Sequence, residues 1–343
     1  MFSRLIGNDK AKDLLRRTVA GGRVPHALLF AGPDGVGKKE FALELARALI
    51  CQSTVNGEAC GNCAACNRIG VFDLAKSEKG EDYDRVFLSD HPDVGLVIAY
   101  KRNLRVGAIR ELEREANFRP FEANLRIFII DDADKMNDAA SNALLKTLEE
   151  PPSTTKLILI SSRPDSMLQT IRSRCQTIRF APVAAEEIEK FLTDSKKMSA
   201  NDAALAAGVS EGSVGRALNM DLTQFRSTRD SMLGILQSAL VSGDISSMLQ
   251  TAEQMNDAKN KDRFEDTIEI LQTLIRDIFA LKQGSDIITN TDIANKLGEL
   301  AENASISSLE SWTIDIEELL GNLSVNINRR IATDALFAAM AAG

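Results

Sequence analysis

The stretch GPDGVGKK, residues 32–39, limits the fold of this chain more than any other feature of its sequence. It matches the phosphate-binding pattern G-x-x-x-x-G-K at Gly32, Gly37 and Lys38. An apolar run, HALLFAG, leads into it, and an amphipathic segment, KKEFALELARALI, follows it. Strand, glycine-rich turn and helix are the context in which backbone N–H groups close around a phosphate. The sequence therefore predicts an α/β domain of the P-loop kind.

The residue that follows Lys38 departs from this pattern. Most such loops carry Ser or Thr there, because the hydroxyl helps to hold Mg²⁺, and a lysine ammonium cannot ligate a cation. Gly32, Gly35, Gly37, Lys38 and Lys39 therefore form a candidate nucleotide site in which binding of ATP with Mg²⁺ stays open. The alternative is a loop that serves only as a turn between a strand and a helix.

A second strand-like segment, RIFIIDDADKM at residues 126–136, ends in two aspartates. In P-loop ATPases the carboxylate after such an apolar run holds Mg²⁺, directly or through water, and Asp131 has this position. Asp132 stands where such an ATPase usually carries a Glu that activates water. Asp is shorter by about 1 Å, an error that can cost about a hundredfold in rate. We therefore expect weak hydrolysis at most, and the alternative is a pair of exposed turn carboxylates.

Four of the five cysteines fall within one short segment. Its spacing is C-x8-C-x2-C-x2-C, from Cys51 through Cys60 and Cys63 to Cys66. Disulfides are rare in the cytoplasm, and four thiolates suit a tetrahedral Zn²⁺ ion. An iron–sulfur cluster also takes four cysteines, but its usual spacings differ. The segment offers no His or acidic ligand for an open position, so we predict a structural zinc ion, with cluster or redox use as the alternatives.

Two arginines are further candidates. Arg174 lies in TIRSRCQTIRF, residues 170–180, just before a strand-like run. The planar fork of an arginine stays charged and suits a phosphate in a neighbouring subunit, although a surface ion pair is the commoner role. Arg216 lies in GSVGRAL, residues 212–218, and could fold back onto a bound nucleotide. A capped helix with an exposed arginine explains that segment equally well.

The chain divides into regions of different texture. Residues 1–182 alternate short apolar runs with helical segments, which predicts a parallel sheet with helices on both faces. Residues 183–228 read as a small all-α domain, and residues 229–343 as the longer amphipathic helices of a further all-α domain. Residues 72–90 are charged and aperiodic, which indicates an insertion or an exposed loop.

Charge and hydropathy exclude some classes of protein. The formal net charge is −8, and residues 229–343 hold 18 Asp and Glu against 9 Lys and Arg. That region is a poor surface for nucleic acid, so any DNA contact is expected before it. No apolar run is long enough to span a bilayer, and the N-terminus has no signal-peptide pattern. We therefore expect a cytoplasmic protein without a membrane partner.

Taken together, these segments resemble the bacterial clamp-loader subunits of the AAA+ class, and within it the delta-prime family of DNA polymerase III. The resemblance rests on the order of five motifs: HALLFAGPDGVGKK, the four cysteines, HPDV, IIDDADKMNDAASNALLKTLEEPP and IRSRCQ. It is dense over residues 1–182 and fair to about residue 228. Beyond that point it rests on length and helical texture.

The resemblance implies a stator in a five-subunit ring that loads the sliding clamp onto primed DNA during replication. Arg174 would be an arginine finger that completes the ATP site of an adjacent motor subunit, tau or gamma, and Ser161 or Ser162 stands at the sensor-1 position. The resemblance further implies a clamp-opening delta subunit, the sliding clamp and primer–template DNA as partners. Residues 183–228 would form the lid domain, and the helices of residues 229–343 would form the collar that closes the ring.

Three other functions stay open at this point. The chain could be a true motor of the tau or gamma kind, with Mg²⁺ held by Asp131 and water, although Lys39 argues against it. It could be a non-enzymatic interaction module that binds through its zinc segment, in which case Arg174 has no role. A small-molecule kinase with a P-loop is the most distant alternative, because the Ser-Arg-Cys triplet does not suit it.

Overall fold

The computed structural model describes residues 1–74, 79–257, 263–323 and 328–342. The chain separates into two compact units. The first comprises Met1–Phe191 with Glu211–Arg216, and the second comprises Leu192–Ser210 with Ala217–Gly343. The division runs through two helices, α7 (Ala185–Lys196) and α9 (Val214–Asn219). The domain boundaries near residues 182 and 228 stay predictions.

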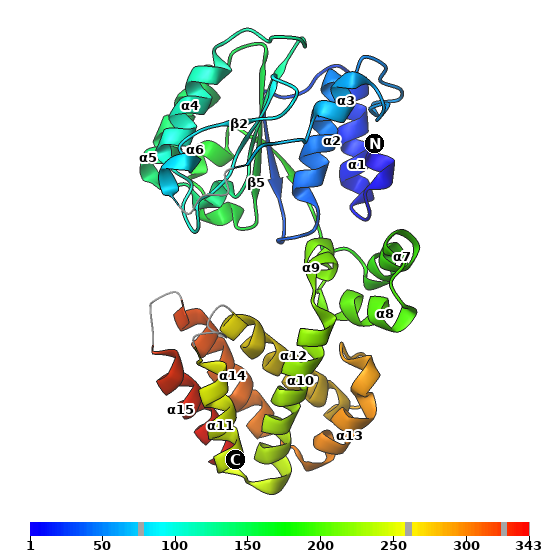
Figure 1. Cartoon of the computed structure of the whole chain (residues 1–343), viewed down its shortest axis with the longest axis vertical. Coiled ribbons are helices and arrows are strands. Elements are labelled where there is room, and N and C mark those ends of the chain that lie inside the picture. The colour runs from blue at the N-terminus through cyan, green and yellow to red at the C-terminus, as the bar shows by residue number, and fades with distance from the viewer. Residues whose placement is uncertain (75–78, 258–262, 324–327, 343) are drawn as a thin grey trace. The chain divides into compact units, whose positions relative to one another are not determined.

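A six-stranded sheet forms the centre of the first unit, in the order β2-β3-β4-β5-β1-β6 (Figure 1). Its strands are β1 (Ala27–Ala31), β2 (Phe87–Leu88), β3 (Val94–Val97), β4 (Arg126–Ile130), β5 (Thr155–Ser161) and β6 (Gln176–Arg179). All neighbouring strands pair in parallel except β2, which runs antiparallel to β3 at one edge. The predicted α/β fold is confirmed.

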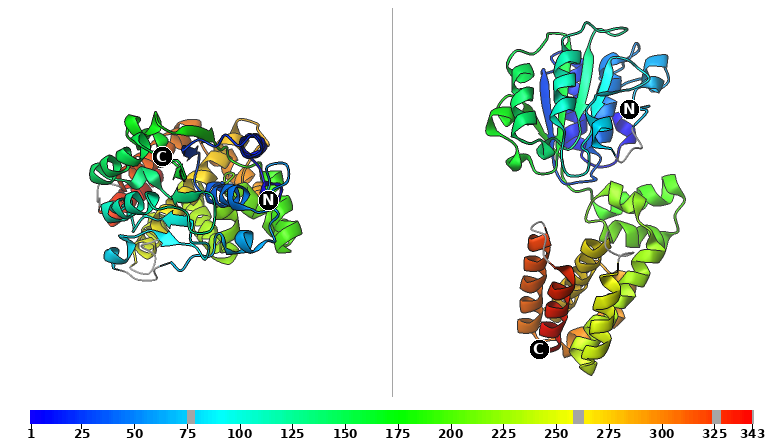
Figure 2. Two further views of the ribbon diagram at one scale, coloured as in Figure 1. Left: turned by 90° about the horizontal axis from the view of Figure 1, so that it is seen from above. Right: turned by 60° about the vertical axis from the view of Figure 1, so that its left-hand side comes forward.

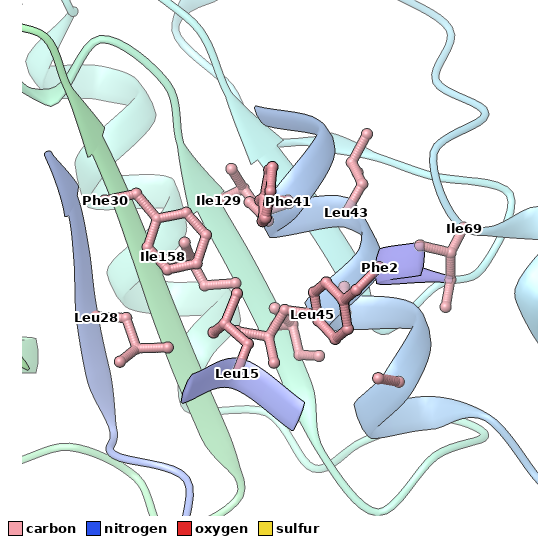
Figure 3. Packing of buried hydrophobic residues seen from close by; sticks show 14 of the residues in the cluster. Phe2, Leu15, Leu28, Phe30, Phe41, Leu43, Leu45, Ile69, Ile129 and Ile158 are labelled. Carbon is pink, nitrogen blue, oxygen red and sulfur yellow. The ribbon is translucent and has the colours of Figure 1, made fainter. Parts of the chain in front are cut away.

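Helices cover both faces of this sheet, as predicted. They are α1 (Asp9–Ala20), α2 (Lys38–Ile50), α3 (Ala64–Arg68), α4 (Val106–Ala116), α5 (Asp138–Glu149) and α6 (Gln169–Arg172). Figure 1 shows α1, α2 and α3 on one face and α4, α5 and α6 on the other. Side chains alternate along β1, so Leu28 and Phe30 join one buried core (Figure 3) while Leu29 joins the other. Burial on both faces explains why β1 reads as a continuous apolar run.

The segment at residues 72–90 differs in part from the predicted exposed loop. Residues 75–78 lie outside the described residues. Beyond them the chain forms a 3-10 turn, Gly80–Tyr83, and then the edge strand β2. Val86, Phe87 and Ser89 are buried. The exposed-loop prediction is therefore wrong for Val86, Phe87 and Ser89, whereas Leu88 is exposed. A two-residue strand is too short to show a period in the sequence.

The second unit is helical, as the sequence indicates. Its complete helices are α8 (Ala200–Val209), α10 (Leu222–Gln237), α11 (Ile245–Met255), α12 (Phe264–Lys282), α13 (Ala294–Asn303), α14 (Ile306–Asn322) and α15 (Arg329–Ala342). The helices from α10 onward lie side by side (Figure 2) around one apolar core that includes Phe264, Trp312 and Phe337. Within the described residues, no helix combines the length and apolar character needed to cross a bilayer.

Candidate functional site

The phosphate loop lies between the end of β1 and the start of α2. A Cβ atom on Gly32 would come within 2.3 Å of the Phe180 carbonyl oxygen, so only glycine fits there. Gly35 and Gly37 have φ of 72° and 95°, the left-handed region that favours glycine. Gly37 begins α2, and no side chain caps that helix end. The backbone thus has the form that the sequence pattern predicts.

Lys38 points into the loop. Its side chain is 5% exposed, and its ammonium donates to the carbonyl oxygens of Gly32 and Pro33, both at 2.6 Å. Asp34 is the nearest carboxylate, at 3.9 Å. Burial lowers the pKa of Lys38 below its usual value, against the attraction of Asp34 and the aspartates near residue 131. Carbonyl groups of the loop therefore accept the hydrogen bonds that the Lys38 ammonium donates.

Lys39 pairs with the carboxylate predicted to hold Mg²⁺. Its Nζ atom lies 3.1 Å from Oδ2 of Asp131, which directly follows β4. Mg²⁺ requires oxygen ligands at about 2.0–2.1 Å in octahedral geometry. An ammonium in contact with the carboxylate repels a divalent cation and supplies no oxygen. The residues present here do not fit Mg²⁺.

The neighbouring carboxylates are also neutralised. Asp132 adopts a left-handed backbone with φ of 54° and binds Lys135 at 2.8 Å. Asp134 accepts the hydroxyl of Ser161 at 2.8 Å and the backbone N–H of Ser162 at 3.2 Å. Burial opposes ionisation of Asp134, but these hydrogen bonds outweigh it and hold its pKa below the usual value. Asp132 is therefore held by Lys135, and the Ser161 hydroxyl is buried against Asp134.

The segment around Arg216 contacts the phosphate loop from outside. The backbone N–H of Gly215 donates to the Gly35 carbonyl oxygen at 2.8 Å. A Cβ atom on Gly35 would lie 2.0 Å from Oγ of Ser213. Arg216 is exposed, and its backbone N–H donates to the Ser213 hydroxyl at 3.2 Å. The structure thus brings the 211–216 segment and the loop together, as the nucleotide-site prediction for Arg216 requires.

Arg174 follows helix α6 and lies at the surface. Its guanidinium donates to the Thr170 carbonyl oxygen at 2.8 Å and pairs with Glu149 at 2.8 Å. The Arg174 and Glu149 side chains are 35% and 50% exposed, so this pair is open to solvent. The neighbouring Cys175 thiol is partly buried, which raises its pKa to about 11. Arg174 is thus held through its guanidinium by Thr170 and Glu149 at the solvent-exposed surface.

Arg174 and the phosphate loop lie at opposite ends of two neighbouring parallel strands. Strands β1 and β6 are parallel neighbours, with Leu28 beside Gln176 and Ala31 beside Arg179. The loop follows the carboxyl end of β1, whereas Arg174 precedes the amino end of β6. The four residues of β6, Gln176–Arg179, lie between them and span about 13 Å. Arg174 therefore does not reach the phosphate loop of its own chain.

The four cysteines converge, as predicted. Cys51, Cys60, Cys63 and Cys66 have sulfur atoms that all lie within 4.8 Å of one another. Cys60 and Cys66 have sulfur atoms 3.9 Å apart, close to the edge of about 3.8 Å of a zinc tetrahedron with Zn–S bonds of 2.3 Å. The four sulfur atoms are thus close enough together to bind one metal ion.

The surroundings of the four sulfurs differ, and burial raises the pKa of the Cys66 thiol. Backbone N–H groups point at three of them: Cys60 N–H lies 3.3 Å from the Cys51 sulfur, and Cys63 and Cys66 donate to the preceding sulfurs at 3.4 and 3.5 Å. The Cys66 N–H lowers the pKa of the Cys63 thiol to about 6. Arg47 of α2 donates to the carbonyl oxygens of Cys66 and Ile69, which joins the segment to the core.

Sequence reasoning missed two buried aspartates. Asp134, described above, orders the end of β5. Asp93 is fully buried, and its carboxylate accepts the backbone N–H groups of Phe121, Glu122 and Ala123 at 2.7–2.8 Å. The only signal for Asp93 was the HPDV motif, in which an acid directly precedes an apolar run. Its partners lie 28 to 30 residues away in a stretch without periodicity.

Comparison with known proteins gives the family. Residues 7–184 match a family model described as "DNA polymerase III, delta subunit", and residues 227–336 match its "C terminal" counterpart. The chain is 31% identical to DNA polymerase III subunit delta' of Escherichia coli, over 92% of this chain and 89% of that protein. The corresponding Bacillus subtilis subunit is 28% identical, over 92% and 90%.

More distant similarities were also found. The tau subunit of DNA polymerase III from Bacillus subtilis is 28% identical over 79% of this chain and 46% of that protein. A solved gamma subunit-related protein from Thermotoga maritima shares 17% identity with a TM-score of 0.43, covering 96% of this chain and 98% of that one. On the strength of the family models and the Escherichia coli relative, the chain belongs to the delta-prime family of DNA polymerase III clamp-loader subunits.

Proposed function

We propose that this subunit is a stator of the clamp loader, which donates Arg174 to the ATP site of a neighbouring motor subunit. The observation that carries the proposal is the ion pair between Lys39 and Asp131. A lysine bound to the carboxylate of the metal position leaves this chain without the Mg²⁺ that phosphoryl transfer needs. The chain then contributes to hydrolysis through another subunit.

The position of Arg174 supports action in trans. Its guanidinium is held by one backbone carbonyl and one exposed carboxylate, so it can exchange Glu149 for a phosphate of another chain. An arginine fork forms two parallel hydrogen bonds to a phosphate and stays charged at every physiological pH. Its distance from its own phosphate loop leaves a neighbouring subunit as the recipient.

The family assignment also supports the remaining partners. We propose that the chain assembles with tau or gamma motor subunits and the delta subunit, and acts on the sliding clamp and primer–template DNA. The helices of residues 229–343 would form the collar, and their excess of 18 acidic over 9 basic residues keeps DNA contacts to the earlier regions.

We propose that the four cysteines hold a structural Zn²⁺ ion. Thiolates are the ligands that zinc prefers, and four of them leave no open position for a substrate or an activated water. The ion would fix the turn between α2 and α3 against the core. Metal analysis of the purified protein checks this directly, and less than about half an equivalent of zinc per chain contradicts it.

The stator proposal is tested by ATP hydrolysis of the reconstituted loader, stimulated by clamp and primed DNA. Arg174→Ala in this chain is expected to slow hydrolysis at least about tenfold, since an arginine finger is worth about 10³–10⁵ at a single site and other sites persist. Lys38→Ala is expected to change the rate less than about twofold. If Lys38→Ala is the damaging change, the chain is a motor and the stator proposal is wrong.

A further inference from the structure

The aspartates that follow β4 would bind Mg²⁺ only if their negative charge were not already neutralised by other side chains. Each of the three carboxylates already has a basic partner within its own chain. Asp131 pairs with Lys39 at 3.1 Å, Asp132 with Lys135 at 2.8 Å, and Asp134 with Arg163 at 3.4 Å. The carboxylates are therefore neutralised by side chains, and an added divalent cation gains little attraction from them.

Only one of these basic groups comes from the phosphate loop itself. Lys39 is the second residue of α2 and holds the position of the metal-binding hydroxyl in the pattern. Lys135 and Arg163 come from the segments that follow β4 and β5. The backbone of the loop keeps its predicted form, with left-handed glycines at residues 35 and 37 and Lys38 pointing inward. Of these three basic groups, Lys39 is thus the one that stands at the position of the metal-binding hydroxyl.

We infer that Lys39 is a covalently attached substitute for Mg²⁺, and that this single side chain closes the phosphate loop to a Mg²⁺–nucleotide. Its ammonium supplies the positive charge beside Asp131 that the metal supplies in a working site. The same ammonium repels the metal and withholds an oxygen ligand from it. The inference concerns the chain by itself and holds whether or not Arg174 acts on a neighbour.

A second feature of the structure would also exclude a nucleotide from the phosphate loop. The 211–216 segment lies on Gly35, with Ser213 and Gly215 in contact with the loop backbone. This cover would also hinder a nucleotide, whatever residue followed Lys38. The two explanations differ in which substitution opens the site, so they can be separated by experiment.

The test measures ADP binding to the full chain by titration calorimetry, once with Mg²⁺ and once with a chelator that leaves the structural zinc in place. For the wild type, Mg²⁺ is expected to change ADP affinity less than twofold. For Lys39→Thr, which restores the hydroxyl, Mg²⁺ is expected to tighten ADP binding at least tenfold and to raise the melting temperature when ADP is present. Binding is the readout because Asp132 keeps hydrolysis slow in either protein.

Two control variants make the result specific. Lys135→Met removes a lysine of the same cluster whose exposure is similar to that of Lys39. Ser213→Gly removes the side chain of the 211–216 segment that contacts Gly35. Both are expected to behave as the wild type. The inference is overturned if Mg²⁺ tightens ADP binding tenfold in the wild type or in either control, or if folded Lys39→Thr shows no effect of Mg²⁺. Lys39→Ser replaces Lys39→Thr if circular dichroism shows that the threonine variant is unfolded.

Discussion

The phosphate loop and the cysteine segment flank the same helix, α2, but they differ in whether their side chains are already paired with other groups of the chain. In the loop, each charged group turns to a partner within the chain: Lys38 to two carbonyls and Lys39 to Asp131. In the cysteine segment, the four sulfurs lie within 4.8 Å of one another, and backbone N–H groups donate to three of them. In the phosphate loop, the charged side chains are paired within the chain, whereas in the cysteine segment four sulfur atoms surround one common point.

The difference teaches how much a binding motif depends on one residue. Four cysteines are chemically identical, so their spacing alone predicts their use. The phosphate loop combines unlike parts, and replacing one hydroxyl by an ammonium changes what it can bind while its backbone stays intact. The predictions below test each side of this comparison.

The largest effect is expected from removing a ligand of the proposed zinc ion. Cys60→Ser should lower the melting temperature by more than about 5 °C, because the binding energy of a structural zinc ion is folding energy, worth about 2 kcal/mol or more here. Cys175→Ser is the matched control, since Cys175 lies outside the cluster. Equal shifts for the two variants, or no shift for Cys60→Ser, would show that the segment folds without a metal.

A smaller effect is expected at the loop backbone. Gly35→Ala should destabilise the chain by about 1–3 kcal/mol, because its φ is 72° and the added Cβ would lie 2.0 Å from Oγ of Ser213. Gly22→Ala shares a positive φ of 64° but meets no atom within 4 Å, so it reports the backbone strain alone. Urea unfolding of both variants gives the cost of the contact as their difference, and a difference of zero would mean that the 211–216 segment moves aside.

The smallest effect is a pH dependence from Lys38. Burial lowers the pKa of Lys38 below 10.5, so the unfolded chain holds this proton more tightly than the folded chain. Stability from this group therefore rises with pH as the pH approaches 10.5, by at most about 1.4 kcal/mol per pH unit. Lys38→Met should flatten this rise in urea unfolding measured between pH 8.5 and 10.5. An unchanged slope would place the Lys38 ammonium in water.

The sequence predicted those parts of the fold that are buried on both faces. The strands β1, β4 and β5 are continuous apolar runs, and each was found at its place. The edge strand β2 was not predicted, because it has only two residues, whereas the strand-like run after Arg174 corresponds to β6, of which only Ile178 is buried. A strand at the edge of a sheet needs little apolar surface, so its sequence carries little signal.

The candidate site was predicted residue by residue but not pair by pair. The patterns placed Lys39 and Asp131 at one site, although 92 positions separate them in the chain. They did not reveal that the two bind each other, since an ion pair depends on side-chain direction. The same holds for Arg174 and Glu149, whose contact joins the end of α5 to the turn after α6. Contacts of this kind follow only from three-dimensional structure.

The separation of Arg174 from the phosphate loop gives any assembly built on it a direction. A donor at one end of the strands and a receiving loop at the other would produce head-to-tail contacts, which close into a ring or continue as a filament. Under the stator proposal, this subunit gives an arginine to a neighbour and has no working ATP site of its own to receive one. It would then mark the first position in the series of working sites, and each further copy of it in the ring would remove one of them.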